Sequence, residues 1–239
     1  MSENKSHNAL ILGICIFLGL ATLGYLLSNA AINFKEYERT VTAKGLSERE
    51  FIADIVIWPI RFTVASNDLT ELYDSIESNT SEIKSFLTNK GISLSEISFG
   101  PPAITDKSAQ QYSSNAKAEF RYTAFQTVTV YSENVTAVRE LISSLSVLIK
   151  KGIVFSGENY ESKTEYIFKS LNEVKPEMIE EATKKAREVA QKFAADSQSK
   201  LGKIKKASQG QFSIKPRDKN NPHIKKVRVV STVEYYLSD

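Results

Sequence analysis

The sequence predicts an α+β protein in which antiparallel sheets pack against helices, behind an N-terminal helix long enough to cross a membrane. Three observations support this class. An uncharged apolar run fills residues 9–27, several later segments alternate apolar and polar residues as strands do, and others repeat apolar residues at helical spacing. After the N-terminal helix, the predicted order of elements is ββαββαβαββ.

The apolar run at residues 9–27 would be about 28 Å long as a helix. A bilayer's hydrocarbon core is about 30 Å thick, so the run predicts a transmembrane anchor between a short tail, residues 1–8, and a linker, residues 28–36. A signal peptide cleaved near Ala30 is the alternative. A lipoprotein carrying lipid on Cys15 is rejected, because a large residue precedes this cysteine and a dozen apolar residues follow it.

The flanks of the run bear on its orientation. Lys5 precedes it and four basic residues follow closely, at positions 35, 39, 44 and 49. Charge counting alone would leave the large domain in the cytoplasm, but large domains cross largely regardless of charge, and an N-terminal apolar run normally directs export. We therefore expect a single-pass protein of the bacterial inner membrane with its domain in the periplasm, or a periplasmic protein after cleavage.

The first two strands are expected at residues 37–46 and 51–64, as a β-hairpin with Gly45 near its turn. The second strand is apolar on both faces, which predicts burial on both sides. Its Pro59 cannot donate to a strand ladder and indicates an edge or a bulge beside Trp58. Two interpretations stay open: a core tryptophan, or a subunit interface formed by Ile55, Ile57, Trp58 and Pro59.

The middle of the chain alternates helices and strands. A helix is predicted from Asp68, a capping residue, to Gly91, a left-handed stop. Strands are expected at residues 92–99 and 118–130, and a second helix runs from a cap at Ser132 to Gly152. Shorter strand candidates are residues 153–155 and 164–169.

The last third contains the strongest helix, from about Pro176 to about Lys200. Its predicted buried stripe is rich in alanine, which would let it lie close to a sheet; the stripe contains Met178, Ala182, Ala186, Val189, Ala190 and Phe193. Residues 203–214 and 224–237 form a closing hairpin over the loop 215–223. Residues 37–239 are thus expected to form one α+β domain.

Residues for catalysis are few. The histidines are His7, before the apolar run, and His223, in a charged loop, and no cysteine follows Cys15. There is no zinc-type spacing, no glycine-rich phosphate loop and no nucleophile elbow. We expect no enzyme, no catalytic residue, no metal and no cofactor.

One cluster is strongly basic. Between residues 200 and 228 the chain has ten lysines and arginines and one acid, Asp218. A patch that could hold anionic lipid or an anionic glycan is predicted at Lys203, Lys205, Lys206, Lys215, Arg217, Lys225, Lys226 and Arg228. The alternative is a solvated hairpin balanced by the acids of the preceding helix. No stacking aromatics are interleaved, so nucleic acid is not expected.

Several short stretches, in their order and spacing, resemble one family. They include Val41-Thr-Ala-Lys-Gly45, Ala53-Asp54 with Trp58-Pro59, Lys175-Pro176, Phe193-Ala194-Ala195-Asp196, Pro216-Arg217-Asp218 and Val227-Arg228-Val229-Val230. Residues 37–239 resemble the SIMPL-domain (YggE-like) family of exported bacterial envelope proteins, many of which have Pro-Asp where this chain has Ala53-Asp54. The resemblance implies an α+β domain, export, homo-oligomers that can be ring- or channel-like, and a loose link to stress tolerance. It implies no catalytic residues.

Two functions remain open from the sequence. The first is a non-enzymatic, membrane-anchored periplasmic protein that assembles with copies of itself. The alternative is a monomeric binding module that docks an anionic envelope component through the basic C-terminal hairpin.

Overall fold

The computed structural model describes residues 3–37, 39–109, 119–157 and 163–238. The chain forms two compact units, each built from separate stretches of sequence. The first unit contains residues 1–48, 175–213 and 228–239, and the second contains residues 49–174 and 214–227. The fold is α+β with antiparallel sheets, as the sequence predicts.

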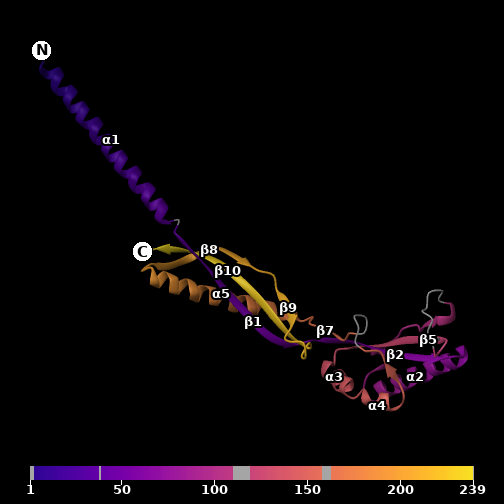
Figure 1. Cartoon of the computed structure of the whole chain (residues 1–239). Helices are drawn as coiled ribbons and strands as arrows, with labels where there is room; N and C mark the ends of the chain where they lie inside the picture. The colour runs from indigo at the N-terminus through magenta and orange to yellow at the C-terminus, as the bar shows by residue number, and fades with distance from the viewer. Residues whose placement is uncertain (1–2, 38, 110–118, 158–162, 239) are drawn as a thin grey trace. The chain divides into compact units, whose positions relative to one another are not determined.

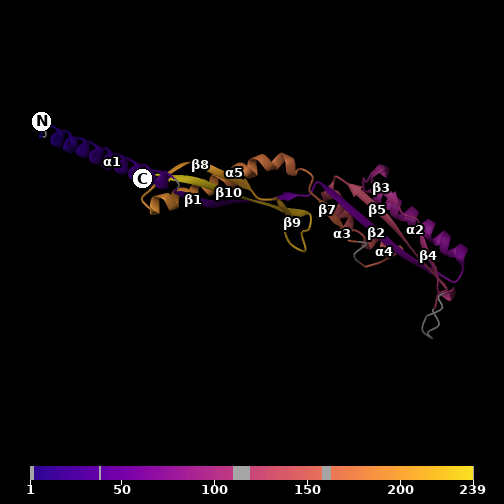
Figure 2. The same cartoon turned by 90° about the horizontal axis from the view of Figure 1, so that it is seen from above.

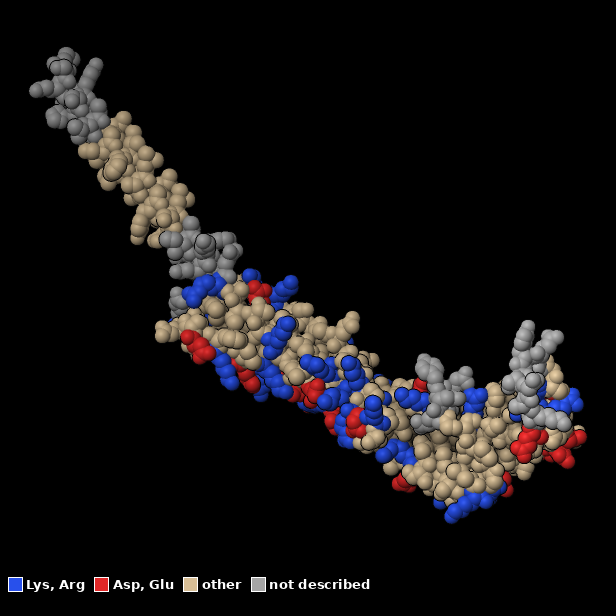
Figure 3. All heavy atoms as spheres, viewed as in Figure 1, with Lys and Arg blue, Asp and Glu red and all other residues tan. Residues whose placement is uncertain are grey.

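Helix α1 (Glu3–Tyr37) opens the chain. Its stretch Leu12–Ala30 is long and apolar enough to cross a membrane and is not buried by any other part of the described chain. Figure 3 shows this stretch without a charged side chain. The helix also includes residues 28–36, the predicted linker, which is therefore helical. An N-terminal anchor and a signal peptide both have these features.

The sheet of the first unit has the strand order β1-β10-β8, with bounds β1 (Thr40–Ile52), β8 (Lys200–Gln209) and β10 (Ile224–Ser238). Strands β8 and β10 run antiparallel. Strand β1 is also antiparallel to β10, because Leu237 donates to the Arg39 carbonyl (2.8 Å) at one end and Arg228 meets Glu48 (4.0 Å) at the other.

Helix α5 (Leu171–Asp196) lies against this sheet (Figures 1 and 2). Its buried residues are Met178, Ala182, Ala186, Ala190 and Ala194. The predicted alanine stripe is confirmed, but Val189 and Phe193 were wrongly placed in it, because they are exposed. The small stripe lets the helix backbone approach β1 so closely that a Cβ on Gly45 would stand 1.9 Å from the Ala182 carbonyl oxygen.

The second unit contains a six-stranded sheet of order β3-β5-β2-β6, with β4 paired to β5 and β7 paired to β2. Its strands are β2 (Ile55–Ser66), β3 (Ile97–Phe99), β4 (Ala103–Asp106), β5 (Tyr122–Ser132), β6 (Val154–Phe155) and β7 (Glu165–Ile167). Helices α2 (Leu69–Asn89), α3 (Val135–Ser143) and α4 (Ser146–Lys150) share one hydrophobic core with β2 and β5. Short 3₁₀ turns are η1 (Leu94–Glu96) and η2 (Lys107–Ala109).

The predicted first hairpin is wrong. Strand β1 pairs with β10 and β2 pairs with β5, so the two consecutive strands belong to different sheets. The residues between them are held by more distant partners, since the Ala53 N–H donates to the His223 carbonyl (2.8 Å) and the Asp54 carboxylate accepts from the Ser170 N–H (2.9 Å). Gly45 therefore lies within a strand and not at a turn.

The predicted start and stop of the first helix are confirmed, but the second and third predicted helices begin at other residues, and the second is divided into α3 and α4. Asp68 caps α2 by accepting from the N–H groups of Thr70 and Glu71, as predicted, and Gly91 follows the helix with a φ of 91°. Helix α3, however, is capped by Asn134, not by Ser132. Helix α5 begins five residues before Pro176, so this proline is inside the helix and not at its first position.

The predicted closing hairpin is confirmed. Strand β9 (Ser213–Pro216) pairs with β10, and the Arg217 N–H donates to the Ile224 carbonyl (2.8 Å) across the loop that joins them.

Candidate functional site

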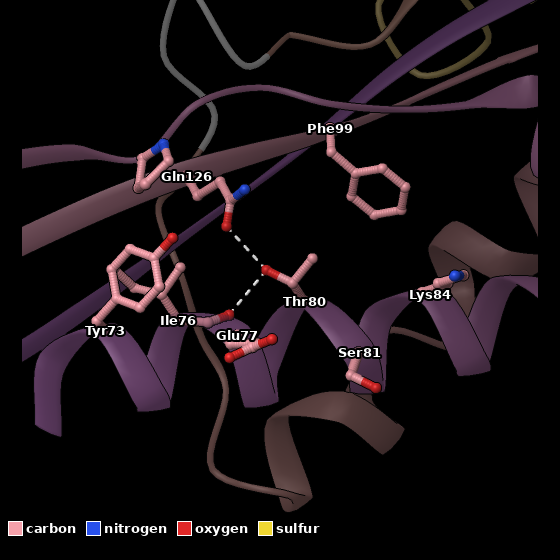
Figure 4. A pocket seen from close by; sticks show the side chains of 9 residues that line it. Tyr73, Ile76, Glu77, Thr80, Ser81, Lys84, Phe99 and Gln126 are labelled. Carbon is pink, nitrogen blue, oxygen red and sulfur yellow. Dashed lines mark hydrogen bonds between the residues drawn. The ribbon is translucent and has the colours of Figure 1, made fainter. Parts of the chain in front are cut away.

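A cleft of about 360 Å³ lies between α2 and the strands of the second unit. Figure 4 shows its side chains, most of them from α2; the lining residues are Tyr73, Ile76, Glu77, Thr80, Ser81, Lys84, Phe99, Pro102 and Gln126. We call this the α2 cleft. The exposed rings of Tyr73 and Phe99 make part of its wall apolar.

The polar centre of the α2 cleft is the buried Gln126 on β5. Its Oε1 accepts from the Thr80 hydroxyl (2.8 Å), and its Nε2 donates to the Gly100 carbonyl (2.8 Å). The Thr80 hydroxyl also contacts the Ile76 carbonyl (2.7 Å). Because each of these groups is engaged within the chain, they tie α2 to the sheet and leave little polar capacity for a ligand.

A second cavity, of about 870 Å³, also lies in the second unit. Its charged lining residues come from α3, from the segment before β7, from β9 and from the β9–β10 loop; they are Arg139, Lys163, Lys215, Asp218 and Lys219. The rest of the lining is Ile142, Ser143, Thr164, Tyr166, Pro216, Asn220, Pro222 and His223. We call this the basic cavity, because its lining contains four cations and one carboxylate.

The carboxylate of the basic cavity organises the loop on which it stands. Asp218 accepts from the backbone N–H groups of Asn220 and Asn221 (2.8 Å each) and from the Arg217 guanidinium (2.9 Å). The hydrogen bond from Arg217 is the main cause that lowers the pKa of Asp218 to about 2. An aspartate that bonds to the next backbone N–H groups stabilises a turn. Asp218 is thus committed to the shape of its loop.

His223 forms part of the cavity wall, with only 7% of its surface exposed. Its ring meets the Tyr166 ring edge-on, with 5.9 Å between centroids. Its Nδ1 is buried and has no hydrogen-bond partner among the described residues. Burial is the main cause that lowers the pKa of His223, and the nearby charge of Arg139 adds to it.

We expect the buried neutral state of His223 to make stability depend on pH. Below its ordinary pKa of 6.5 the unfolded chain takes up a proton that the folded chain resists, so the free energy of unfolding falls as pH drops from 6.5 toward the lowered pKa. Above pH 6.5 the imidazole is neutral in both states, so His223 lowers the free energy of unfolding no further. Urea unfolding of the full chain at several pH values between 8 and 5.5 measures this decline.

The control uses the chain's other histidine. The His7→Gln variant is expected to keep the decline and His223→Asn to flatten it. Equal slopes in His223→Asn and the unchanged chain would contradict the assignment.

The predicted interface residues divide between core and surface. Ile55 and Trp58 are buried, and Trp58 is part of the hydrophobic core of the second unit; Ile57 and Pro59 are half-buried. Pro59 lies opposite Thr129 of β5, at a position between the β2 stretches that pair with β7 and β6. Of these four residues, only Ile57 and Pro59 have exposed surface that a partner could contact. The interface stays a prediction.

The predicted anion patch is divided between the two units. Lys203, Lys205, Lys206 and Arg228 belong to the first, and Lys215, Arg217, Lys225 and Lys226 to the second. Of these eight, Lys215 alone lines the basic cavity in the described chain. Lys225 is buried, which lowers its pKa, and Arg217 is held by Asp218 and by Glu50 (3.6 Å). A patch formed by all eight stays a prediction.

Sequence reasoning missed three cations of the basic cavity. Arg139 and Lys163 lie far from the basic cluster in the sequence, and Lys219 was left out of the predicted patch although it stands within the cluster. No local pattern relates Arg139 to Lys219, because their approach depends on the pairing of distant strands. The described residues also contain no group of three His, Cys, Asp or Glu that could hold a metal ion.

These features define a class: an α+β body behind an N-terminal apolar helix, which is consistent with an envelope protein. Residues 41–234 match the model of the SIMPL family, described as a protein of unknown function (DUF541), and the chain belongs to that family. No curated protein matches the sequence.

Proposed function

We propose that this protein is held in the inner membrane by α1, with its α+β body in the periplasm, and that it acts by assembling with copies of itself and not by catalysis. The apolar Leu12–Ala30 stretch supports anchoring, and a body without cysteine suits an exported domain that needs no disulfide. The link to stress tolerance implied by the family resemblance stays a prediction.

The observation that carries assembly is the outer edge of β8. This strand of ten residues is last in the order β1-β10-β8, and every residue except Leu201 is exposed. One side of its backbone pairs with β10, and in the described chain no strand pairs with the other side. A long exposed edge strand is a template for pairing with another chain.

Charge favours a head-to-tail contact between copies. The charged residues of β8 are all lysines, at positions 200, 203, 205 and 206, so pairing two β8 strands would bring like charges together. Strand β1, the opposite edge of the same sheet, carries both signs, including Glu48 and Lys44. Joining β8 of one copy to β1 of the next extends the sheet from copy to copy. Such head-to-tail contacts form rings where the rotation from copy to copy closes and filaments where it does not.

The mass of the assembly is the first test. We expect the full chain, extracted in neutral detergent at tens of micromolar, to have a protein mass that is a multiple of 26.7 kDa by light scattering. A stable monomer would overturn the assembly proposal. Mass spectrometry of the same sample tests the anchor, because loss of residues 1–30 would show a cleaved signal peptide.

A pair of proline variants tests the edge itself. The Gly210 N–H donates to the Val230 carbonyl (2.8 Å), and donors along an antiparallel strand alternate between the two sides. By this alternation the Ser208 N–H points toward β10 and the Ala207 N–H toward the open edge. Ala207→Pro therefore removes an outward donor, which an edge strand tolerates, whereas Ser208→Pro removes a bond within the sheet.

We expect Ala207→Pro to remain folded, by circular dichroism, and to run as a monomer. Ser208→Pro is expected to lose stability. A folded Ala207→Pro variant that keeps the full assembly mass would exclude the β8 edge as the contact.

A further inference from the structure

We propose that the basic cavity binds a small phosphate ester, an organic ligand with at least two negative charges. The observation that supports this proposal is that four cations, from four separate places in the chain, line one cavity of about 870 Å³. Arg139 stands on α3, Lys163 precedes β7, Lys215 is on β9, and Lys219 is in the loop after it. The inference is independent of self-assembly.

No described carboxylate pairs with any of these four cations. None of them has a side-chain hydrogen bond or ion pair with any residue that the structure describes. The one carboxylate in the lining, Asp218, is occupied by Arg217 and by two backbone N–H groups of its own loop. Four like charges around one cavity repel one another, so an anion between them gains attraction from each and relieves that repulsion.

The arrangement suits phosphate better than a single carboxylate. A phosphate group presents oxygens in several directions and can accept from an arginine fork and from separate ammonium groups at the same time. The cavity also has an apolar wall, formed by Ile142, Tyr166, Pro216 and Pro222. This wall can contact the organic part of an ester, and the volume lies within the range of about 300–1,000 Å³ that is usual for small-ligand sites.

His223 supplies an independent readout in the same wall. Its ring is nine-tenths buried, and the charged groups that act on it are Arg139, Arg217, Asp218 and Lys225. The three cations disfavour the protonated imidazole and Asp218 favours it. A bound dianion adds negative charge beside the ring, so binding is expected to raise the pKa of His223.

The test uses the full chain in neutral detergent with inositol hexakisphosphate as the phosphate ester and myo-inositol as its uncharged control. Calorimetry is expected to show saturable binding of the ester only. Each cation removed, Arg139→Gln or Lys219→Gln, should weaken binding by about tenfold, the size of a charge-assisted hydrogen bond. The matched control is Lys203→Gln on β8, which removes one positive charge outside the cavity, as each cavity variant does inside it, and should change affinity less than twofold.

NMR titration in a His7→Gln chain, where His223 is the remaining histidine, should show its pKa rise when the ester is bound. Repeating calorimetry in nanodiscs separates two sources of phosphate. If phosphatidylglycerol discs weaken ester binding relative to phosphatidylcholine discs, and Arg139→Gln removes that difference, a lipid headgroup occupies the cavity. If the ester binds with equal affinity in both kinds of disc, the ligand is a soluble ester. Unchanged affinity in both cavity variants, or an equal loss in the β8 control, overturns the proposal.

Discussion

Replacing Gly45 with alanine is expected to destabilise the first unit severely. The added Cβ would stand 1.9 Å from the Ala182 carbonyl oxygen and 2.4 Å from the Ala186 nitrogen. Both are backbone atoms of α5, so relief requires the helix to move away from β1 instead of a side chain turning aside. Overpacking typically costs about 1–3 kcal/mol, and we expect a loss at or above the upper end, measured by urea unfolding of the full chain.

The control for this prediction is Gly157→Ala, because a Cβ at Gly157 meets no atom within 4 Å. That variant should unfold at nearly the same urea concentration as the unchanged chain. If Gly45→Ala unfolds there as well, the close approach of α5 to β1 is wrong.

Replacing Trp58 with alanine is expected to cost about 3–5 kcal/mol, the usual loss for a large aromatic removed from a core. Only 4% of Trp58 is exposed, and its neighbours in the same core include the fully buried Phe62, Val128 and Leu72. The deletion leaves a cavity that the surrounding strands and helices close only in part. Circular dichroism during urea unfolding measures the loss without relying on tryptophan fluorescence.

The Trp58 variants also separate the two interpretations of this residue. A core role predicts that Trp58→Phe recovers much of the stability and that assembly mass is unchanged in any variant that stays folded. Should Trp58→Ala keep its stability but lose the assembly, Trp58 would be an interface residue after all.

The structural features that the sequence predicted correctly are those whose interacting residues lie close together along the chain. The cap at Asp68, the left-handed Gly91 and the alanine stripe of α5 were predictable, because each depends on residues two to four positions apart. The first hairpin was predicted wrongly for the opposite reason. Adjacent strands usually pair, but here Ala53 and Asp54 bond to His223 and Ser170, more than a hundred positions away.

The candidate site shows the same division. The basic run near the C-terminus was visible as composition, yet the strands divide it between two units and leave Lys225 buried. Arg139 and Lys163 carried no signal of their own, since an isolated basic residue in a sequence is most often solvated. Their role became visible only where they line the same cavity as Lys215 and Lys219.

Local patterns in the sequence were enough to predict the fold class, the N-terminal apolar helix, most helix positions and the closing hairpin, because these follow from periods of two and 3.6 residues and from local caps. The folded chain was needed to see that β1 and β2 join different sheets, that Gly45 must lack a side chain beneath α5, and that four cations line one cavity. Those features depend on packing and pairing between distant segments, which no local spacing of residues encodes.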